Sequence, residues 1–306
     1  MWGADLENEL PDLFPGYESV TIEAAGTGFY CRIGGSGPPL LLLHGYPQSH
    51  VIWHKIAPLL DKHFTLVLPD LPGYGQSSVP PMTQDHWPYS KRCIASSLVE
   101  MMRGFGHERF FLAGHDRGGR VAYRMALDTP DALERLAVLD ILPTSEYWDR
   151  MDRTFGLKIY HWTFLAQPAP FPEELISSSP IHFLEHTLAS WTAEKNLTCF
   201  SEAAMIHNRA WFRDPDRIAA TCEDYRAGAT IDYLHDKADQ EAGNIIQKPL
   251  LALWGGLGIA TSVDDPLSVW RPWCPQAIGA VLDCGHFLPE ESPHETAEHL
   301  LNFLLS

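Results

Sequence analysis

The sequence predicts an α/β protein built on a mostly parallel sheet that is flanked by helices and interrupted by an inserted helical cap. Short apolar runs of strand length alternate with helix-like stretches through the first half of the 306-residue chain. This alternation stops after Pro143 and resumes only at Pro249, with an aromatic, proline-containing region between them. The alternation is typical of a doubly wound sheet, whose functional groups lie at the carboxyl ends of its strands.

Four apolar runs in the first half have the length of a buried parallel strand. Each is followed by polar or glycine-rich residues, and in chain order they are 40–43, 64–68, 110–113 and 136–139. Residues 90–105 and 119–127 lie between these runs and have the composition of helices. Because parallel strands need a crossover connection, helices in these places support the parallel arrangement.

The region after Pro143 is rich in aromatic residues and helix formers, and several prolines interrupt it. No strand-turn-helix rhythm is visible there, so we expect a helical cap inserted into the sheet domain. Strands are expected again at 250–255 and 280–283, and a last helix near 295–305. The predicted division is a first part of the core at 1–143, a cap at 144–228 and a second part of the core at 229–306.

The composition excludes some classes of partner and gives no sign of others. Lys and Arg number 22 against 39 Asp and Glu, a formal charge of −17, which argues against nucleic acid or an anionic membrane as the partner. No apolar run approaches the roughly 20 residues of a membrane span. The N-terminal stretch lacks the basic-then-apolar pattern of a secretory signal, so a cytoplasmic protein is expected.

The six cysteines are scattered along the chain and form no Cys-x-x-Cys pair, which predicts free thiols in a reducing compartment and no zinc site. The negative net charge also bears on the substrate. Because the overall field repels anions, an anionic substrate would have to be held by local arginines.

The most informative motif is Gly114-x-Asp116-x-Gly118, which directly follows the predicted strand at 110–113. This spacing is that of a nucleophile elbow, a sharp strand-to-helix turn that presents one side chain above the sheet. The usual nucleophile is a serine, which attacks carbonyl carbons. An aspartate there instead displaces a leaving group from a saturated carbon and forms an alkyl ester. The alternative is an elbow that has lost catalysis.

An ester on Asp116 must then be hydrolysed, which requires a general base. His286 follows a late strand, where elbow hydrolases place their histidine. Asp140, at the end of the strand after the elbow helix, is the predicted carboxylate partner that orients His286. Asp264 and Asp265, in the loop after the strand at 250–255, are the alternatives for this role.

Arg117 and Arg120 flank the predicted nucleophile and indicate the class of substrate. Arg120 lies four residues after Asp116, on the same face of the helix. Guanidinium groups here can hold a carboxylate while Asp116 reaches the adjacent carbon, which describes a 2-halo acid. The alternative is that both arginines pair with structural acids such as Glu134 or Asp128.

The proposed chemistry needs two further sets of donors. The backbone N–H groups of Tyr46 and Arg117 are the predicted oxyanion hole, which stabilises the tetrahedral intermediate. The leaving halide needs hydrogen-bond donors as well, and His161, Trp162 and Tyr225 in the cap can donate. An aromatic cap is also what packing alone would produce.

With these residues the chain resembles the fluoroacetate (haloacetate) dehalogenases of the α/β-hydrolase superfamily, nearly from end to end. The resemblance rests on His-Gly-Tyr-Pro-Gln-Ser-His at 44–50, Gly-His-Asp-Arg-Gly-Gly-Arg at 114–120, and Asp-Tyr-Arg-Ala-Gly at 224–228. It implies an α/β-hydrolase fold, a triad of Asp116, His286 and Asp140, and carboxylate-binding Arg117 and Arg120. It also implies a halide site made of His161, Trp162 and Tyr225.

The resemblance further implies hydrolysis of haloacetate to glycolate and halide by a homodimer, without a metal or an organic cofactor. Two positions depart from the family pattern. Tyr46 stands where the family commonly has Phe, and Gly256-Leu257 replaces small residues such as Ala-Ser. The second departure is expected near the entrance or wall of the site, where it would affect turnover or substrate range.

Two other functions are compatible with parts of this pattern. An epoxide hydrolase uses the same aspartate elbow, but it usually has a tryptophan after the nucleophile and two cap tyrosines. Here Arg117 follows the nucleophile, and Tyr225 is a stronger candidate than Tyr160 for a proton donor. A non-catalytic receptor for a small carboxylate is the other alternative, although a receptor has no need of a water-activating base.

Overall fold

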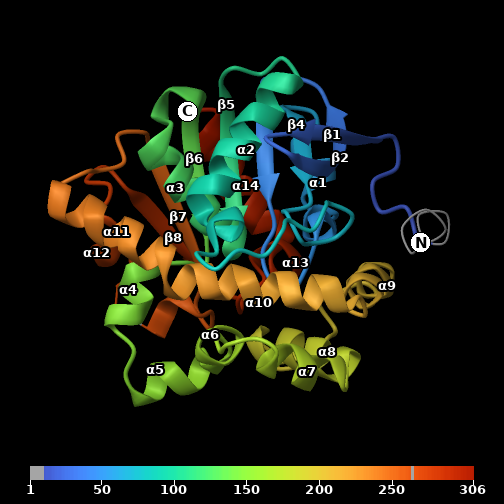
Figure 1. Ribbon diagram of the computed structural model, residues 1–306. Coiled ribbons are helices and arrows are strands. Elements are labelled where there is room, and N and C mark those ends of the chain that lie inside the picture. The colour runs from blue at the N-terminus through green and yellow to red at the C-terminus, as the bar shows by residue number, and fades with distance from the viewer. Residues whose placement is uncertain (1–9, 263–264) are drawn as a thin grey trace.

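The computed structural model describes residues 10–262 and 265–306, within which eight strands form one sheet (Figure 1). The order across the sheet is β1-β2-β4-β3-β5-β6-β7-β8. β1 and β2 pair antiparallel, β2 pairs antiparallel with β4, and the other neighbours are parallel. The strands are β1 Glu18–Ala24, β2 Thr27–Gly35, β3 Pro39–Leu43, β4 Thr65–Pro69, β5 Phe110–His115, β6 Leu133–Leu139, β7 Leu250–Gly255 and β8 Ile278–Leu282. The predicted fold class is confirmed.

The six strands predicted from apolar runs are present as β3 to β8, but the hairpin of β1 and β2 is missing from the prediction. β1 has the sequence Glu-Ser-Val-Thr-Ile-Glu-Ala, and most of its residues are exposed or half-buried. It lies at the edge of the sheet and pairs antiparallel, so one of its faces can stay in water. A search for continuous apolar runs therefore cannot detect it.

Helices cover both faces of the sheet because successive residues of a strand point to opposite sides. Leu41 and Leu43 of β3 belong to one apolar cluster, together with residues of α2 and α3. Leu40 and Leu42 belong to a second cluster, together with residues of α1 and α14. The helices of the core are α1 Ala57–Leu60, α2 Lys91–Gly104, α3 Arg117–Asp128, α12 Pro266–Trp270, α13 Leu288–Glu291 and α14 Pro293–Leu304.

The chain between β6 and β7 contains helices and no strand, as expected for the cap. Figure 1 shows α6, α7, α8 and α10 together below the sheet. These helices are α4 Thr144–Asp149, α5 Arg153–Lys158, α6 Tyr160–Leu165, α7 Phe171–Ser177, α8 Pro180–Trp191, α9 Glu202–Trp211, α10 Pro215–Ala229 and α11 Ile231–Ala242. Residue 228 lies at the end of α10, and α11 packs against α4 and α10. The domain boundaries themselves stay a prediction.

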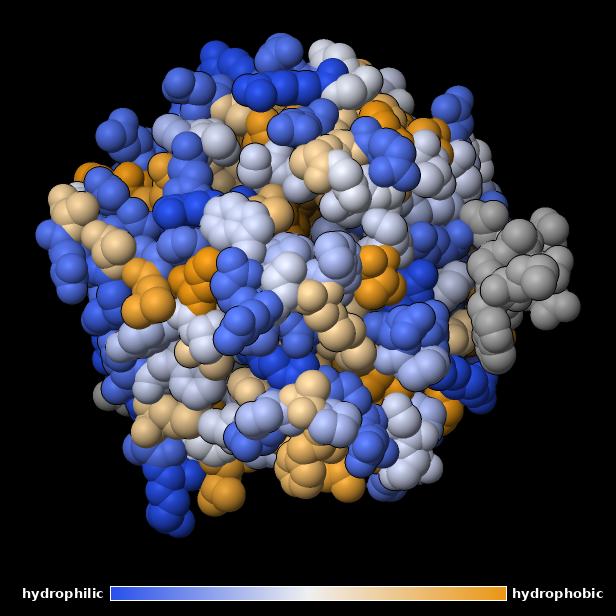
Figure 2. Space-filling view, in the orientation of Figure 1, coloured by the Kyte–Doolittle hydropathy of each residue, from blue (hydrophilic) through white to orange (hydrophobic). Residues whose placement is uncertain are grey.

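The surface and the cysteines agree with the composition. The face seen in Figure 2 has apolar side chains scattered among polar ones. Within the described residues, no helix is both long and apolar enough to span a bilayer. The six cysteines are unpaired, and four of them, Cys31, Cys222, Cys274 and Cys284, are buried.

Candidate active site

Asp116 stands between the end of β5 and the start of α3, with a backbone φ of 47° and ψ of −115°. A β-carbon on Gly114 would lie 2.4 Å from the carbonyl oxygen of Gly118, and one on Gly45 would lie 2.4 Å from the β-carbon of Asp116. Only glycine fits at either place. The turn therefore has the tight geometry that the Gly-x-Asp-x-Gly spacing predicts, with Asp116 at the carboxyl edge of the sheet.

The backbone N–H of Tyr46 donates a hydrogen bond of 2.9 Å to Oδ1 of Asp116. Arg117 is the first residue of α3, where backbone N–H groups have no acceptor within the helix. The structure thus brings the Tyr46 donor to the carboxylate and puts the Arg117 donor at a helix start directly after it. Both positions agree with the predicted oxyanion hole.

His286 and Asp140 contact each other although they are 146 positions apart in the chain. Nδ1 of His286 lies 2.6 Å from Oδ2 of Asp140, inside the protein. Asp140 also accepts hydrogen bonds from the backbone N–H groups of Gly255 and Ile259, at 3.2 and 2.8 Å. These contacts fix the carboxylate, which in turn keeps the proton of His286 on Nδ1.

The other ring nitrogen of His286 faces the nucleophile. Nε2 lies 3.9 Å from Oδ2 of Asp116 and has no hydrogen-bond partner among the described residues. Its lone pair is therefore available to accept a proton from a water beside Asp116. Of the alternative acids, Asp265 accepts from the N–H of Leu267 at the start of α12, and Asp264 lies outside the described residues.

Arg120 is buried at 1 % exposure, and no described carboxylate lies within 4 Å of its guanidinium. Its Nη1 donates to the carbonyl oxygen of Leu142 at 3.0 Å, while its Nε has no partner. The guanidinium carbon lies 4.4 Å from the ring centre of Trp162. A buried cation without a counter-ion is costly, so this site is suited to an anionic ligand.

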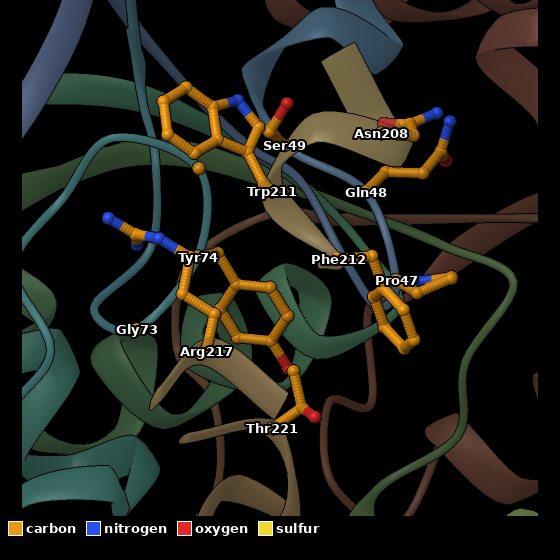
Figure 3. A pocket seen from close by; sticks show the side chains of 11 residues that line it. Pro47, Gln48, Ser49, Gly73, Tyr74, Asn208, Trp211, Phe212, Arg217 and Thr221 are labelled. Atoms are coloured by element: carbon orange, nitrogen blue, oxygen red, sulfur yellow. The ribbon is translucent and has the colours of Figure 1, made fainter. Parts of the chain in front are cut away.

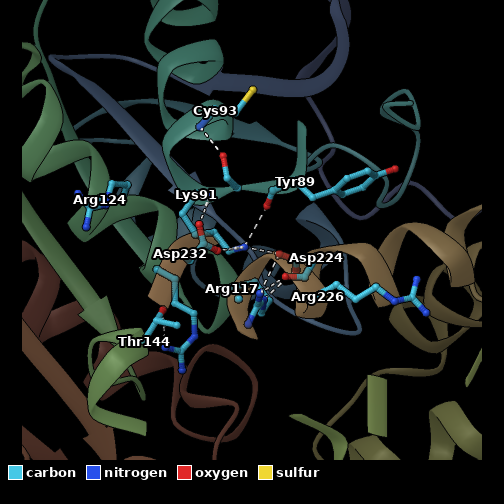
Figure 4. A network of polar contacts seen from close by, with 12 residues as sticks. Tyr89, Lys91, Cys93, Arg117, Arg124, Thr144, Asp224, Arg226 and Asp232 are labelled. Carbon is cyan, nitrogen blue, oxygen red and sulfur yellow. Dashed lines mark hydrogen bonds and ion pairs between the residues drawn. The ribbon is translucent and has the colours of Figure 1, made fainter. Parts of the chain in front are cut away.

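The guanidinium of Arg117 is expected to be free for a substrate carboxylate, but part of it binds Asp224, an acid that the sequence does not indicate as a partner. Its Nε and Nη2 donate to the carboxylate of Asp224 at 2.8 and 2.9 Å, whereas its Nη1 has no partner (Figure 4). The same carboxylate is also bound by the ammonium of Lys91 and the hydroxyl of Tyr74. One terminal nitrogen of Arg117, rather than the pair that would bind a carboxylate with two hydrogen bonds, is thus left for a ligand.

The Asp224 network joins the cap to the core. Asp224 lies on α10 beside Tyr225, and Arg117 lies on α3 beside Asp116, so this ion pair sets the spacing between cap and nucleophile. Burial opposes ionisation, but Arg117 and Lys91 hold the pKa of Asp224 well below its usual value.

The acids named as alternative partners are bonded elsewhere, Glu134 to Arg109 and Asp128 to Arg92 and Arg124.

The predicted halide donors lie together beside the two arginines. The rings of His161 and Tyr225 have centres 5.5 Å apart, and the centres of the Trp162 and Tyr225 rings are 6.1 Å apart. Nδ1 of His161 and the hydroxyl of Tyr225 are buried without a hydrogen-bond partner in the described part of the chain. Buried polar atoms without a partner are unusual, and here they occur beside the arginines, since the guanidinium carbon of Arg117 lies 4.3 Å from the ring centre of Tyr225.

The charges in this space are fixed over a wide pH range. Burial raises the pKa of the Asp116 carboxyl, but His286, His115 and the two arginines outweigh it, and the net pKa lies below the usual value. Burial lowers the pKa of His161 to about 3, and burial with the charge of Asp116 raises that of Tyr225 well above 10. Asp116 is therefore an anion, and both donors are neutral, at physiological pH.

This predicts a pH-independent first chemical step. The rate of halide release in a single turnover should be flat from about pH 5 to 9 and should fall only below the ordinary pKa of an aspartate, because the pKa of Asp116 is lowered. Rapid-mixing measurements of halide release over this range check the prediction. A rise through neutral pH in this step would mean that a titrating base activates the nucleophile, which an aspartate does not need.

A separate narrow hollow lies beside the Tyr46 loop, between that loop and the cap helices α9 and α10 (Figure 3). The space between its walls, including solvent at its mouth, is about 300 Å³, and its lining includes Pro47, Tyr74 and Phe212. Phe212 and Tyr46 form an edge-on ring contact with centres 6.2 Å apart. None of the predicted catalytic residues lines this hollow, so the chemistry belongs to the space around Asp116 instead.

Two further residues of the site escaped the sequence analysis. Asp224 directly precedes Tyr225, but nothing in its sequence context indicates a partner on α3. Trp191 closes one side of the site, with its ring centre 4.4 Å from that of His161 and 5.4 Å from that of His286. A tryptophan in an aromatic cap carries no sequence signal that separates a site wall from ordinary packing.

Comparison with known proteins places this site in a family. The model of the alpha/beta hydrolase fold matches residues 38–293, most of the chain. The chain belongs to the alpha/beta hydrolase family. A fluoroacetate dehalogenase from a Burkholderia species is 43% identical to this hydrolase over 292 residues, covering 95% of each chain. The predicted resemblance is thereby confirmed.

Two other relatives of the hydrolase are informative. A soluble epoxide hydrolase from a Corynebacterium species is 32% identical over 271 residues, covering 88% of this chain and 91% of its own. The crystal structure of a protein inferred to be an alpha/beta hydrolase, from Nostoc sp PCC 7120, is 45% identical with a TM-score of 0.91. It covers 94% of this chain and 98% of its own. The hydrolase therefore resembles enzymes of two different activities.

Proposed function

We propose that this hydrolase cleaves the carbon–halogen bond of haloacetates, giving glycolate and halide through an ester on Asp116. The observation that carries the proposal is the buried, unpaired guanidinium of Arg120 beside the elbow, together with the free Nη1 of Arg117. A bound carboxylate supplies the missing counter-ion and sets its neighbouring carbon against Asp116. The 43% identity to a fluoroacetate dehalogenase supports the same substrate class.

In the first step, a carboxylate oxygen of Asp116 attacks the halogen-bearing carbon from the side opposite the halogen. The new carbon–oxygen bond forms as the carbon–halogen bond breaks, so the halide leaves with the bonding electrons and a stereocentre is inverted. His161, Trp162 and Tyr225 donate hydrogen bonds to the departing halide. Because the Asp116 carboxyl is already ionised, this step needs no base.

In the second step, Nε2 of His286 takes a proton from water, and the resulting hydroxide adds to the carbonyl carbon of the Asp116 ester. Asp140 stabilises the imidazolium. The N–H groups of Tyr46 and Arg117 donate to the oxyanion of the tetrahedral intermediate. The intermediate then expels the glycolate oxygen, which takes the proton from His286, and the Asp116 carboxyl left behind loses its remaining proton to solvent, which restores the carboxylate.

Epoxide hydrolysis is the second candidate, since a soluble epoxide hydrolase is 32% identical over most of the chain. Opening an epoxide requires a proton donor for its oxygen, and the neutral hydroxyl of Tyr225 has that chemistry. Tyr160, the second candidate tyrosine, is 38% exposed, and its ring lies against that of His161. Arg120 disfavours this function, because an uncharged epoxide leaves it without a counter-ion.

The proposal is tested by measuring fluoride and chloride release from fluoroacetate and chloroacetate, and diol formation from styrene oxide, with Asp116→Ala as the control. Halide release that the Asp116→Ala variant lacks supports the proposal. Chloride release without fluoride keeps the mechanism but restricts the substrate to weaker bonds. Diol formation alone replaces it with epoxide hydrolysis, and no product from any substrate would support the receptor alternative. The homodimer and the cytoplasmic location stay predictions.

A further inference from the structure

A second hollow opens beside the candidate active site, and the space between its walls, including solvent at its mouth, is about 650 Å³. It lies between the end of α5 and start of α6, the end of α8 and the segment that follows β7. Its lining consists of Leu157, Lys158, Tyr160, His186, Ser190, Trp191, Lys195, Leu257 and Ile259. Among the described residues, this lining contains two lysines and no carboxylate, which is unusual in a chain with 39 acidic residues.

Only single side chains separate this hollow from the proposed chemistry. Trp191 lines the hollow, and its ring also contacts the rings of His161 and His286. Ile259 lines the hollow too, and its backbone N–H donates to Asp140. The hollow therefore adjoins the candidate active site and is not a remote surface feature.

The two lysines are held at the hollow without neutralising partners. Nζ of Lys158 donates to the carbonyl oxygen of Gly258 at 2.6 Å, and Nζ of Lys195 donates to that of Ser190 at 2.9 Å. No described carboxylate lies within 4 Å of either ammonium, whereas Lys55, Lys91 and Lys237 each have such a partner. Their positive charge is thus open to an incoming anion.

These lysines matter for binding anions because the chain has a formal net charge of −17. Distant charges are screened over about 10 Å at moderate ionic strength, so the potential at an entrance depends mainly on the charges lining it. A small cationic entrance can therefore attract anions to a strongly acidic protein, and a cleft lined by one sign of charge raises their local concentration. The same reasoning explains why such an entrance is needed here.

We propose that this hollow is the entrance for the carboxylate substrate, in which Lys158 and Lys195 collect small anions and deliver them past Trp191 to Arg120. The inference rests on the proposed function for the identity of the anion. It also assigns a position to Leu257, because that residue is 57% exposed and lines the proposed entrance rather than the catalytic site. Its departure from the family pattern is therefore expected to affect entry.

The test compares the wild type with a Lys158→Met/Lys195→Met double variant on fluoroacetate, with sodium sulfate added to vary the ionic strength. We expect kcat/KM of the variant to fall about 5- to 20-fold at low salt, with kcat unchanged. The wild-type value should decline as salt is added, and that of the variant should stay nearly constant. Lys62→Met is the matched control, because Lys62 is exposed and lies just before β4. It is therefore at the amino ends of the strands, whereas the site is at their carboxyl ends.

Three outcomes would overturn the proposal: kcat/KM within twofold of the wild type, an equal loss of kcat, or the same loss in Lys62→Met.

If the wild type releases no halide, the proposed function fails and the entrance is tested by fluorescence quenching. The signal of Trp191 is obtained by subtracting that of a Trp191→Phe variant. The lysine substitutions should then weaken quenching by iodide at least twofold and leave quenching by neutral acrylamide unchanged, and equal quenching would refute the entrance.

Discussion

Replacing His286 by Asn is expected to leave the substrate carbon bonded to Asp116 as an ester that is hydrolysed only slowly. Asp116 keeps the oxyanion contact from Tyr46 and its arginines, so it can still displace halide. Water is no longer activated beside the ester, since Nε2 of His286 is the base that faces Asp116 at 3.9 Å. We expect one equivalent of halide to be released, followed by turnover about 10³-fold slower than that of the wild type.

Mass spectrometry of the His286→Asn variant after exposure to chloroacetate measures this directly. The intact protein should gain one carboxymethyl group, and peptide mapping should place it on Asp116. The double variant with Asp116→Ala should gain nothing at that peptide. A variant that turns over at the wild-type rate, or an adduct on another residue, would contradict the assigned roles.

The second large effect is expected at Arg120, where binding and stability should respond differently. Replacing Arg120 by Met removes the buried counter-charge for the substrate, and kcat/KM for haloacetate should fall about 100-fold, or roughly 3 kcal/mol. The free protein loses no ion pair, since no described carboxylate is bonded to Arg120. Its free energy of unfolding should therefore stay within about 1 kcal/mol of the wild-type value.

Arg117→Met is the matched comparison, because that guanidinium is bonded to Asp224. Its loss leaves the Asp224 carboxylate with Lys91 and Tyr74 only, and the free energy of unfolding should fall by about 3 kcal/mol. Denaturant unfolding and steady-state kinetics on both variants check the pair of predictions. Equal destabilisation by both substitutions would mean that Arg120 has a structural counter-ion and would weaken the proposed substrate class.

The sequence was sufficient for the parts of the site that depend on local geometry. Asp116, Arg117 and Arg120 belong to one strand-to-helix turn, so their spacing in the chain fixes their spacing in space. Asp140 and His286 are expected beside each other because both follow strands of a parallel sheet, whose carboxyl ends share one edge, and in the structure Nδ1 of His286 lies 2.6 Å from Oδ2 of Asp140.

The parts that the sequence could not predict depend on contacts between distant segments. The pairing of Asp224 with Arg117 spans 107 positions and depends on where α10 lies relative to the start of α3. The unpartnered Nη1 of Arg117 follows from the same placement, whereas the hollow that Lys158 and Lys195 line depends on how α5, α6 and α8 meet the segment after β7. The β1–β2 hairpin escaped for another reason, since an edge strand that is half in water lacks the apolar run of a buried one.

The central claim is that Asp116 bonds covalently to the substrate carbon, and a single turnover in oxygen-18 water tests it most directly. Enzyme in excess over fluoroacetate or chloroacetate should give glycolate with unlabelled hydroxyl oxygen, because that oxygen comes from Asp116. The label should appear in the Asp116 carboxylate, and later turnovers should release it in glycolate. Labelled glycolate in the first turnover, with Asp116 unlabelled, would mean that water attacks the carbon directly and would contradict the ester mechanism.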